Sequence, residues 1–123
     1  MWDGKQKAVT FSYDDGVCQD RRLVDMFNYY HVKATFNINS GMQTYASHYD
    51  FGNVRVHHMN AEGLKELYKG HEIAVHTLTH QDLTKLDKDT VYNEVFLDKQ
   101  NLERMFGCQI TGMAYPYGTY NDE

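Results

Sequence analysis

The chain has 123 residues and a net charge of −5, with 12 basic and 17 acidic side chains. This length allows one domain with a modest core, and we treat residues 1–123 as a single domain. The basic residues are scattered, which argues against nucleic acid as a partner, because phosphate binding requires clustered Lys and Arg. No apolar run is long enough to span a membrane. Residues 1–7 lack the apolar segment of a signal peptide, which leaves the compartment open.

The first half of the chain predicts two strands around one helix. Residues 8–13 are rich in β-branched and aromatic side chains and predict a strand. Apolar residues at helical spacing predict a helix over 19–31, and a second strand is expected at 33–38. A polar and aromatic loop then runs from 39 to about 58. It is long for a compact domain, which favours a functional or mobile segment.

The second half continues the alternation of helices and strands. Asn60 is predicted to cap a short helix that Gly70 ends. A third strand is expected at 71–76, a long helix at 88–106 and a fourth strand at roughly 109–115. The buried side of the long helix is predicted to comprise Val91, Val95, Leu102, Met105 and Phe106.

The predicted order is β-α-β-α-β-α-β, which indicates a parallel sheet with right-handed crossovers. In such sheets, functional side chains gather where the strands end. Asp14 and Asp15 follow the first strand, His76 and His80 follow the third, and Tyr117 follows the fourth. We therefore expect these five residues at one edge of the sheet.

The other cysteine and histidine residues receive simpler interpretations. Cys18 belongs to this edge and Cys108 to the opposite end, which puts the two beyond disulfide reach. His71 begins a strand and is interpreted as structural, and Glu72 beside it is expected in a buried salt bridge or hydrogen bond. The histidines in or beside the long loop are expected to be solvated, with contact to substrate as the less favoured alternative: His48, His57 and His58.

His76 and His80 are four residues apart. On a helical turn this spacing places both imidazoles on one face, within reach of one ion. The spacing alone is a weak signal, because the chain has seven histidines. Together with Asp15, however, the pair forms a three-ligand set with open positions, which is typical of a catalytic metal site.

These residue types can perform one kind of chemistry. A bound metal lowers the pKa of its water to about 7 in favourable zinc sites. Asp14 can then take a proton from that water, and the backbone N–H of Tyr117 can stabilise an oxyanion. Taken singly, the Asp-Asp-Gly and Pro-Tyr-Gly segments are explained by helix capping and an ordinary turn. Their joint placement instead favours metal-assisted hydrolysis of an acyl group.

Three motifs now resemble those of a known family. Residues 12–16, Ser-Tyr-Asp-Asp-Gly, resemble its Thr-Phe-Asp-Asp-Gly motif, and residues 76–80 match its His-Ser/Thr-x-x-His motif. Residues 114–118, Ala-Tyr-Pro-Tyr-Gly, resemble its Arg-x-Pro-Tyr-Gly motif. On this pattern, which extends from residue 8 to 118, the chain resembles the polysaccharide deacetylases of carbohydrate esterase family four, the chitooligosaccharide deacetylase homology domain.

The resemblance implies a role for each residue. Asp14 would be the general base, and the Tyr117 N–H would help to bind the oxyanion. Asp15, His76 and His80 would hold the metal, usually zinc and sometimes cobalt, nickel or manganese. The implied reaction removes acetyl groups from an N-acetylated or O-acetylated oligosaccharide or polysaccharide, such as chitin, peptidoglycan or xylan. The implied fold is a (β/α) barrel, of which this chain would form a part with about four parallel strands.

The sequence departs from the family pattern in two ways. Ala114 stands where the family has an Arg that orients the base, so Asp14 needs another partner. In the family, the fourth and fifth motifs follow the third, and the fifth supplies the histidine that acts as general acid; the residues after Gly118 contain neither motif. We therefore expect the amino-terminal half of a deacetylase domain, completed by further chain, by a complementing chain or by homo-oligomerisation. The alternatives are an amidase or cyclic-imide hydrolase relative, and a metal- or sugar-binding remnant. Ala114 and the missing carboxy-terminal motifs favour the remnant, and the intact Asp14 disfavours it.

Overall fold

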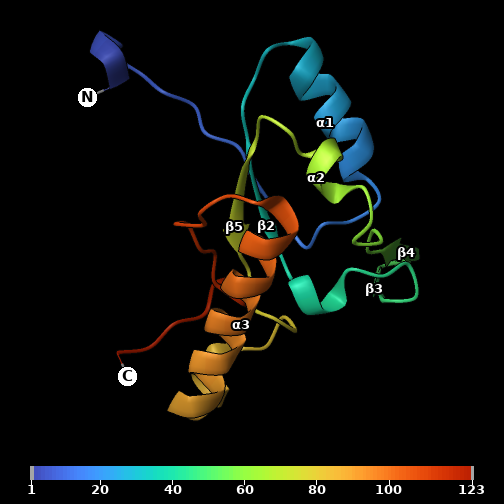
Figure 1. Cartoon of the computed structure of the whole chain (residues 1–123), viewed down its shortest axis with the longest axis vertical. Coiled ribbons are helices and arrows are strands. Elements are labelled where there is room, and N and C mark those ends of the chain that lie inside the picture. The colour runs from blue at the N-terminus through green and yellow to red at the C-terminus, as the bar shows by residue number, and fades with distance from the viewer. Residues whose placement is uncertain (1, 123) are drawn as a thin grey trace.

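The structure is a computed structural model and describes residues 2–122. A three-stranded parallel sheet forms its centre, in the order β1-β2-β5. Figure 1 shows β2 and β5 side by side, with α3 next to them. The strands are β1 (Ser12–Asp14), β2 (Thr35–Ile38) and β5 (Glu72–Val75). β2 is the middle strand, and because all three run in the same direction, their carboxyl ends meet at one edge of the sheet.

Three helices flank this sheet: α1 (Asp20–Tyr29), α2 (Leu64–Leu67) and α3 (Lys88–Phe106). Short 3-10 segments occupy Trp2–Gly4, Ser40–Met42, Leu83–Lys85 and Pro116–Gly118. The long helix agrees with its predicted bounds, since Asp87 caps its first turn and Gly107 ends it in the left-handed conformation. The core joins all three helices to the sheet through buried side chains that include Val24, Phe27, Phe36, Ile38, Leu64, Tyr68, Val75, Leu102 and Phe106.

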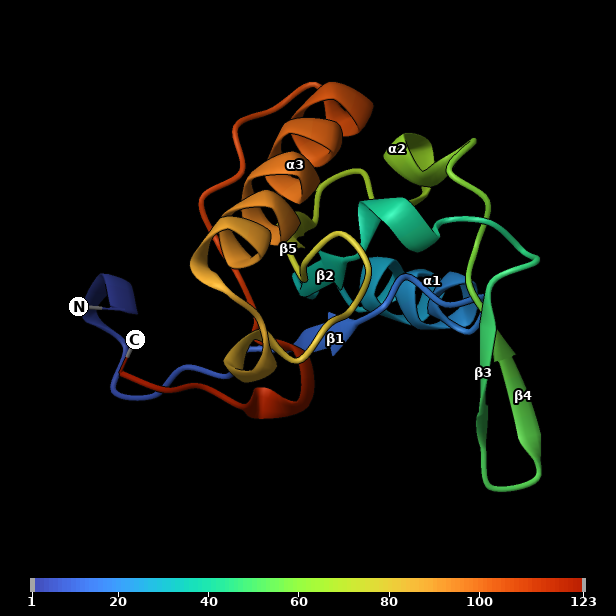
Figure 2. The same ribbon diagram turned by 90° about the horizontal axis from the view of Figure 1, so that it is seen from below.

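The long loop contains a hairpin that the sequence interpretation missed. β3 (His48–Phe51) and β4 (Val54–His57) pair in an antiparallel manner around the two-residue turn Gly52-Asn53. Gly52 adopts a φ of 59°, which glycine reaches without steric cost. The hairpin extends away from the sheet and from α3 (Figure 2). The segment is therefore ordered β structure and not an irregular loop.

Two of the predicted strands are wrong in extent. β1 is limited to three residues because its partner β2 begins only at Thr35, opposite Ser12, so residues 8–11 lie before the start of β2. Residues 109–115 form no strand and make one isolated bridge, between Met113 and Val75. The Ile110 N–H is bound by the Glu103 carboxylate instead, at 3.1 Å. The sheet therefore has three parallel strands and not four.

Two details of the helices also differ from the prediction. Asn60 does not cap α2: its Oδ1 accepts a hydrogen bond from Tyr45 N–H at 2.7 Å, and Gly63 precedes the helix. Val91 and Val95 are only half-buried, since they line a surface cavity of about 520 Å³ along α3. The buried positions of α3 are Glu94, Asp98, Leu102 and Phe106.

Among residues 2–122, no helix is both long and apolar enough to cross a membrane. Cys18 and Cys108 are free thiols, as their predicted separation implied.

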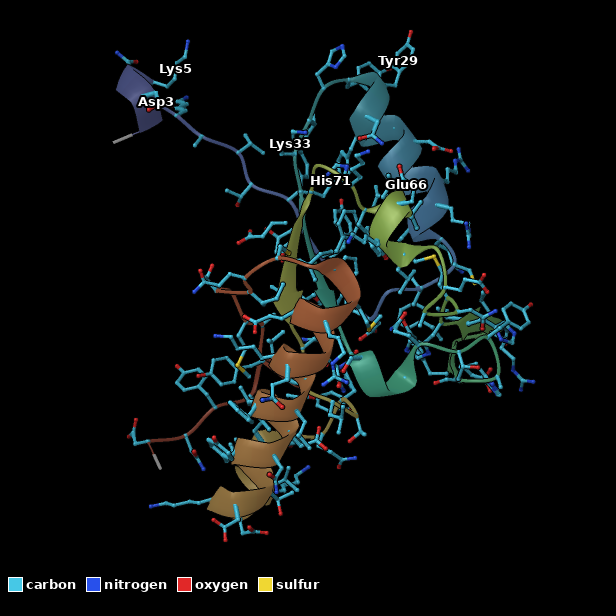
Figure 3. The ribbon with its side chains drawn as sticks, viewed as in Figure 1. Asp3, Lys5, Tyr29, Lys33, Glu66 and His71 are labelled. Atoms are coloured by element: carbon cyan, nitrogen blue, oxygen red, sulfur yellow. The ribbon has the colours of Figure 1, made fainter. Side chains whose placement is uncertain are left out.

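The predicted structural role of His71 is confirmed, because its Nδ1 accepts Ala34 N–H at 3.2 Å and its Nε2–H donates to Asn28. Figure 3 shows His71 near Lys33, at the end of the sheet where β5 begins. Glu72 is exposed and not buried, and its Oε2 accepts a hydrogen bond from Thr35 at 2.5 Å.

Candidate active site

The two acids of the first motif lie where β1 ends. Asp14 is the last residue of β1, and Asp15 and Gly16 both adopt positive φ angles, of 76° and 67°. The Asp15 N–H donates to the backbone carbonyl of Asn37 at 2.9 Å, and the Asp15 carbonyl accepts from the Gln43 side chain at 2.8 Å. A Cβ atom at Gly16 would lie 2.8 Å from Gln43 Oε1, so this turn requires glycine.

The histidine loop, residues 76–80, is not helical, and this corrects the helical turn expected from its spacing. It follows β5 as irregular backbone, in which Thr77 and His80 have φ angles of 68° and 57°. Positive φ is a strained conformation for a β-branched residue, and such strain concentrates at functional sites. The two imidazoles nevertheless lie together, with ring centroids 4.9 Å apart.

Two buried acids of α3 hold the histidine loop in place. Asp98 is fully buried and accepts the backbone N–H groups of His76, at 3.1 Å, and of Ser40, at 2.7 Å. Burial raises the pKa of Asp98 to about 6, against the opposing effect of these hydrogen bonds. Glu94 accepts both the N–H and the hydroxyl of Thr79, at 2.9 and 2.7 Å. The sequence interpretation missed both acids.

Asp15, His76 and His80 direct their ligand atoms towards one point. Asp15 Oδ1 lies 3.6 Å from His76 Nε2 and 3.4 Å from His80 Nε2. All three ligand atoms lie within 4.8 Å of one another. Tetrahedral ligands about 2.1 Å from a zinc ion are about 3.4 Å apart, so the spacing fits such an ion.

The donor atoms of these three side chains also fit a cation. His76 Nδ1–H donates to the backbone carbonyl of Ala114 at 2.9 Å, which leaves the Nε2 lone pair facing Asp15. Burial lowers the pKa of His80, partly offset by Asp15, so its imidazole is neutral at neutral pH. Among the described residues, the buried Asp15 Oδ1 has no hydrogen-bond partner. Together, this buried, unpaired carboxylate oxygen and the two imidazole nitrogens form a ligand set that suits a divalent metal.

Asp14 lies beside this set but outside it. Its Oδ2 is 3.9 Å from His76 Nε2, and its side chain is 52% exposed. Its other oxygen, Oδ1, accepts a hydrogen bond from the Asn37 amide at 2.7 Å. Asp14 can therefore contact a water molecule near the three ligand atoms without itself being one of the ligands.

The tyrosine turn, residues 115–118, meets the histidine loop from the other side. Tyr117 has a φ of 59° and is 69% exposed. Its ring packs edge-on against His80, with centroids 4.7 Å apart. All five predicted site residues thus lie at the carboxyl edge of the sheet, where the fourth predicted strand is replaced by the bridge at Met113.

A cavity of about 870 Å³ opens beside Asp15 and His80, with Tyr117 in its wall. His58 also lines it and is 1% exposed, which corrects the expectation that His58 is solvated. The alternation that buries Val56 in β4 continues to His58 and turns it inward. Tyr49 completes this wall, and burial together with Asp15 raises the pKa of its phenol, so Tyr49 keeps its proton. Recognition of the Gly-Asn hairpin turn would have revealed both residues.

The fold is that of known deacetylases. The Streptococcus pyogenes deacetylase PplD, solved in complex with acetate, superposes with a TM-score of 0.80 at 25% identity, over 97% of this chain and 50% of that chain. The chain matches the family model of polysaccharide deacetylases over residues 3–123, and it belongs to the polysaccharide deacetylase family.

Curated relatives agree with this membership. A chitin deacetylase of Pestalotiopsis sp is 35% identical over 115 residues, which cover 93% of this chain and 35% of that protein. The peptidoglycan-N-acetylglucosamine deacetylase PgdA of Listeria monocytogenes is 27% identical over 121 residues, covering 95% of this chain and 23% of that protein. The chain therefore spans about half the length of the solved relative and less of these curated relatives.

Proposed function

We propose that this chain forms the metal-binding part of a carbohydrate deacetylase, which removes acetyl groups from N-acetylated or O-acetylated oligosaccharides or polysaccharides. The observation that carries the proposal is the convergence of Asp15, His76 and His80 ligand atoms, with Asp14 beside them. Membership of the polysaccharide deacetylase family supports the reaction. The chitin and peptidoglycan named for two relatives favour an N-acetylated amino sugar as the substrate.

In this proposal each side chain has one task. Asp15, His76 and His80 hold a divalent metal, with zinc preferred for two imidazoles and a carboxylate, and cobalt, nickel or manganese as alternatives. When bound, such an ion supplies Lewis acidity to the acyl oxygen and to water. Asp14 takes the proton from the attacking water, and general-base assistance of this kind contributes about 10²–10⁴-fold in rate.

The Tyr117 backbone N–H is the proposed donor to the oxygen on which negative charge develops. The position of the tyrosine turn against His80 supports this role. We further propose that β1, β2 and β5 are part of a larger (β/α) barrel, which further chain, a complementing chain or a second copy completes. The three parallel strands and the half-length match to PplD support this arrangement.

The direct test measures bound metal and released acetate for the unaltered chain and for His76→Ala. The substrate is a chitooligosaccharide, with acetylated xylooligosaccharide as the second probe. We expect about one divalent ion per chain, and a metal affinity reduced more than about 100-fold by His76→Ala, beyond the usual effect of an outer-shell residue. His48→Ala, which removes an exposed histidine of the hairpin, is the matched control. Full metal binding by His76→Ala would refute the site, and metal binding without acetate release would favour a binding-only protein.

A further inference from the structure

Asn37 lies beside both acids of the first motif. It belongs to β2, and the parallel register places it directly opposite Asp14 of β1. The Asn37 backbone carbonyl accepts the Asp15 N–H at 2.9 Å. The main chain of Asn37 thus fixes Asp15, and its side chain is available to act on Asp14.

The Asn37 amide has a single possible orientation. It is 2% exposed, and its Nδ2 donates to Asp14 Oδ1 at 2.7 Å and to Ser12 Oγ at 2.8 Å. The contact from Nδ2 to the Tyr13 carbonyl is longer, at 3.4 Å. An amide group has two hydrogens, and the two short bonds use both. A buried amide with both donors engaged cannot rotate without leaving them unsatisfied.

The contact matters because Asp14 has a largely free carboxylate. Its side chain is 52% exposed, and the Asn37 bond holds only Oδ1. Oδ2 is thereby directed towards the metal ligands, 3.9 Å from His76 Nε2. Ala114 adds only a methyl side chain here, and its backbone carbonyl is already engaged by His76. Asn37 is therefore the partner that Asp14 requires in place of the family's Arg, where this chain has Ala114.

We propose that Asn37 is the positioning residue for Asp14, and that its amide orients the carboxylate so that Oδ2 faces the attacking water. This inference rests on the proposed deacetylase function, because it assigns Asn37 an effect on the base of that reaction. Asn37 touches none of the three ligand atoms, so the effect is separate from metal binding.

The kinetic test is Asn37→Leu, which keeps the branched shape and the number of heavy atoms of the side chain and removes its donors. We expect kcat to fall about 10- to 100-fold, as for a misplaced catalytic group, with KM and metal affinity unchanged. Ser12→Ala is the matched control, because it removes the other acceptor of the amide and spares Asp14. Its kcat should stay within about threefold of the unaltered chain, the effect of one ordinary hydrogen bond. Equal losses in the two variants, or an unchanged kcat in Asn37→Leu, would overturn the proposal.

A spectroscopic test requires neither activity nor a folded Asn37 variant. The side-chain amide resonances of Asn37 are followed by NMR in the metal-free chain, with and without Asp14→Ala. We expect them to shift when the carboxylate is lost, because a hydrogen bond to a charged acceptor is among the strongest in proteins. Resonances that do not move would refute the contact. If the chain releases no acetate but the amide responds, the contact stands and the failure belongs to the proposed function.

Discussion

The histidine loop and the tyrosine turn face each other across the candidate site, but they are built differently. Both contain non-glycine residues at positive φ, 68° at Thr77 and 59° at Tyr117. Thr77 is fully buried, and the loop around it is bound by Asp98, Glu94 and Asn39. Tyr117 is 69% exposed, in a turn whose capping bond is the Thr119 N–H to Pro116 contact at 3.4 Å.

This difference separates two parts of the proposed chemistry. Metal ligands must be held in a fixed geometry, and buried hydrogen bonds to the histidine loop provide that rigidity. The tyrosine turn would contact the acyl group, and it is joined to the sheet by the bridge between Met113 and Val75. In the proposed function, the metal ligands therefore belong to the part of the site that buried hydrogen bonds hold in place, whereas the proposed oxyanion donor belongs to an exposed turn.

Among substitutions that test how the histidine loop is anchored, Asp98→Ala is expected to have the largest effect. The substitution leaves the His76 and Ser40 N–H groups buried without an acceptor, at about 1–3 kcal/mol each. Metal affinity should fall about 10- to 100-fold, as it does when outer-shell partners of a ligand are removed. Titration of the metal with a competing chelator, beside urea unfolding, measures both effects. Asp89→Ala, at an exposed acid of the same helix, is the control, and equal metal affinity in the two variants would contradict the anchoring role of Asp98.

Asp20 tests whether burial of an acid by itself affects the histidine loop. Asp20 accepts the Tyr68 hydroxyl at 2.6 Å, and burial raises its pKa from 3.8 to about 6. Between these values the folded chain binds more protons than the unfolded chain, so stability is present below pH 4 and is lost as pH rises through about 6. Asp20→Asn should remove the Asp20 part of this pH dependence, worth at most about 3 kcal/mol. It should leave the part that belongs to Asp98, and the metal affinity, unchanged.

The measurement is the free energy of unfolding in urea at several pH values between 4 and 7. Asp25→Asn, which removes an exposed charge from the same helix, controls for net charge. If Asp20→Asn lowered metal affinity as much as Asp98→Ala, the loss of metal affinity in Asp98→Ala could not be attributed to the hydrogen bonds between Asp98 and the histidine loop. An unchanged slope in Asp20→Asn would show that the buried carboxyl does not titrate in this range.

The sequence predicted the position of the site better than its local geometry. Strand and helix alternation placed Asp14, Asp15, His76 and His80 at one edge, because parallel strands end together. The helical turn expected for the two histidines was wrong, since hydrogen bonds from α3 shape that loop and spacing in the chain does not reveal them. The burial of Asp98 follows only from tertiary packing, because an acid on a helix is ordinarily solvated.

The errors in the strands have a different origin. Residues 109–115 include strand-forming side chains, but they pair with β5 only at Met113, and the Ile110 N–H is bound by Glu103. The hairpin, in contrast, had a local signal in Gly52-Asn53 between two β-rich runs. Its recognition would have placed His58 on the inner face, since the alternation that buries Val56 in β4 continues to His58 just after the strand.

The smallest expected effects are those of Tyr117→Gly and Thr77→Gly, which should change the free energy of unfolding in opposite directions. Glycine relieves the positive φ at either position, and such strain costs about 1–3 kcal/mol, part of which the added freedom of the unfolded chain offsets. At exposed Tyr117 the free energy of unfolding should rise by about 0.5–1 kcal/mol. At buried Thr77 the lost packing should outweigh the relief, so that stability falls by about 1–2 kcal/mol. Urea unfolding of both variants gives the two signs. Shifts in the same direction would remove the distinction between a buried, anchored histidine loop and an exposed tyrosine turn.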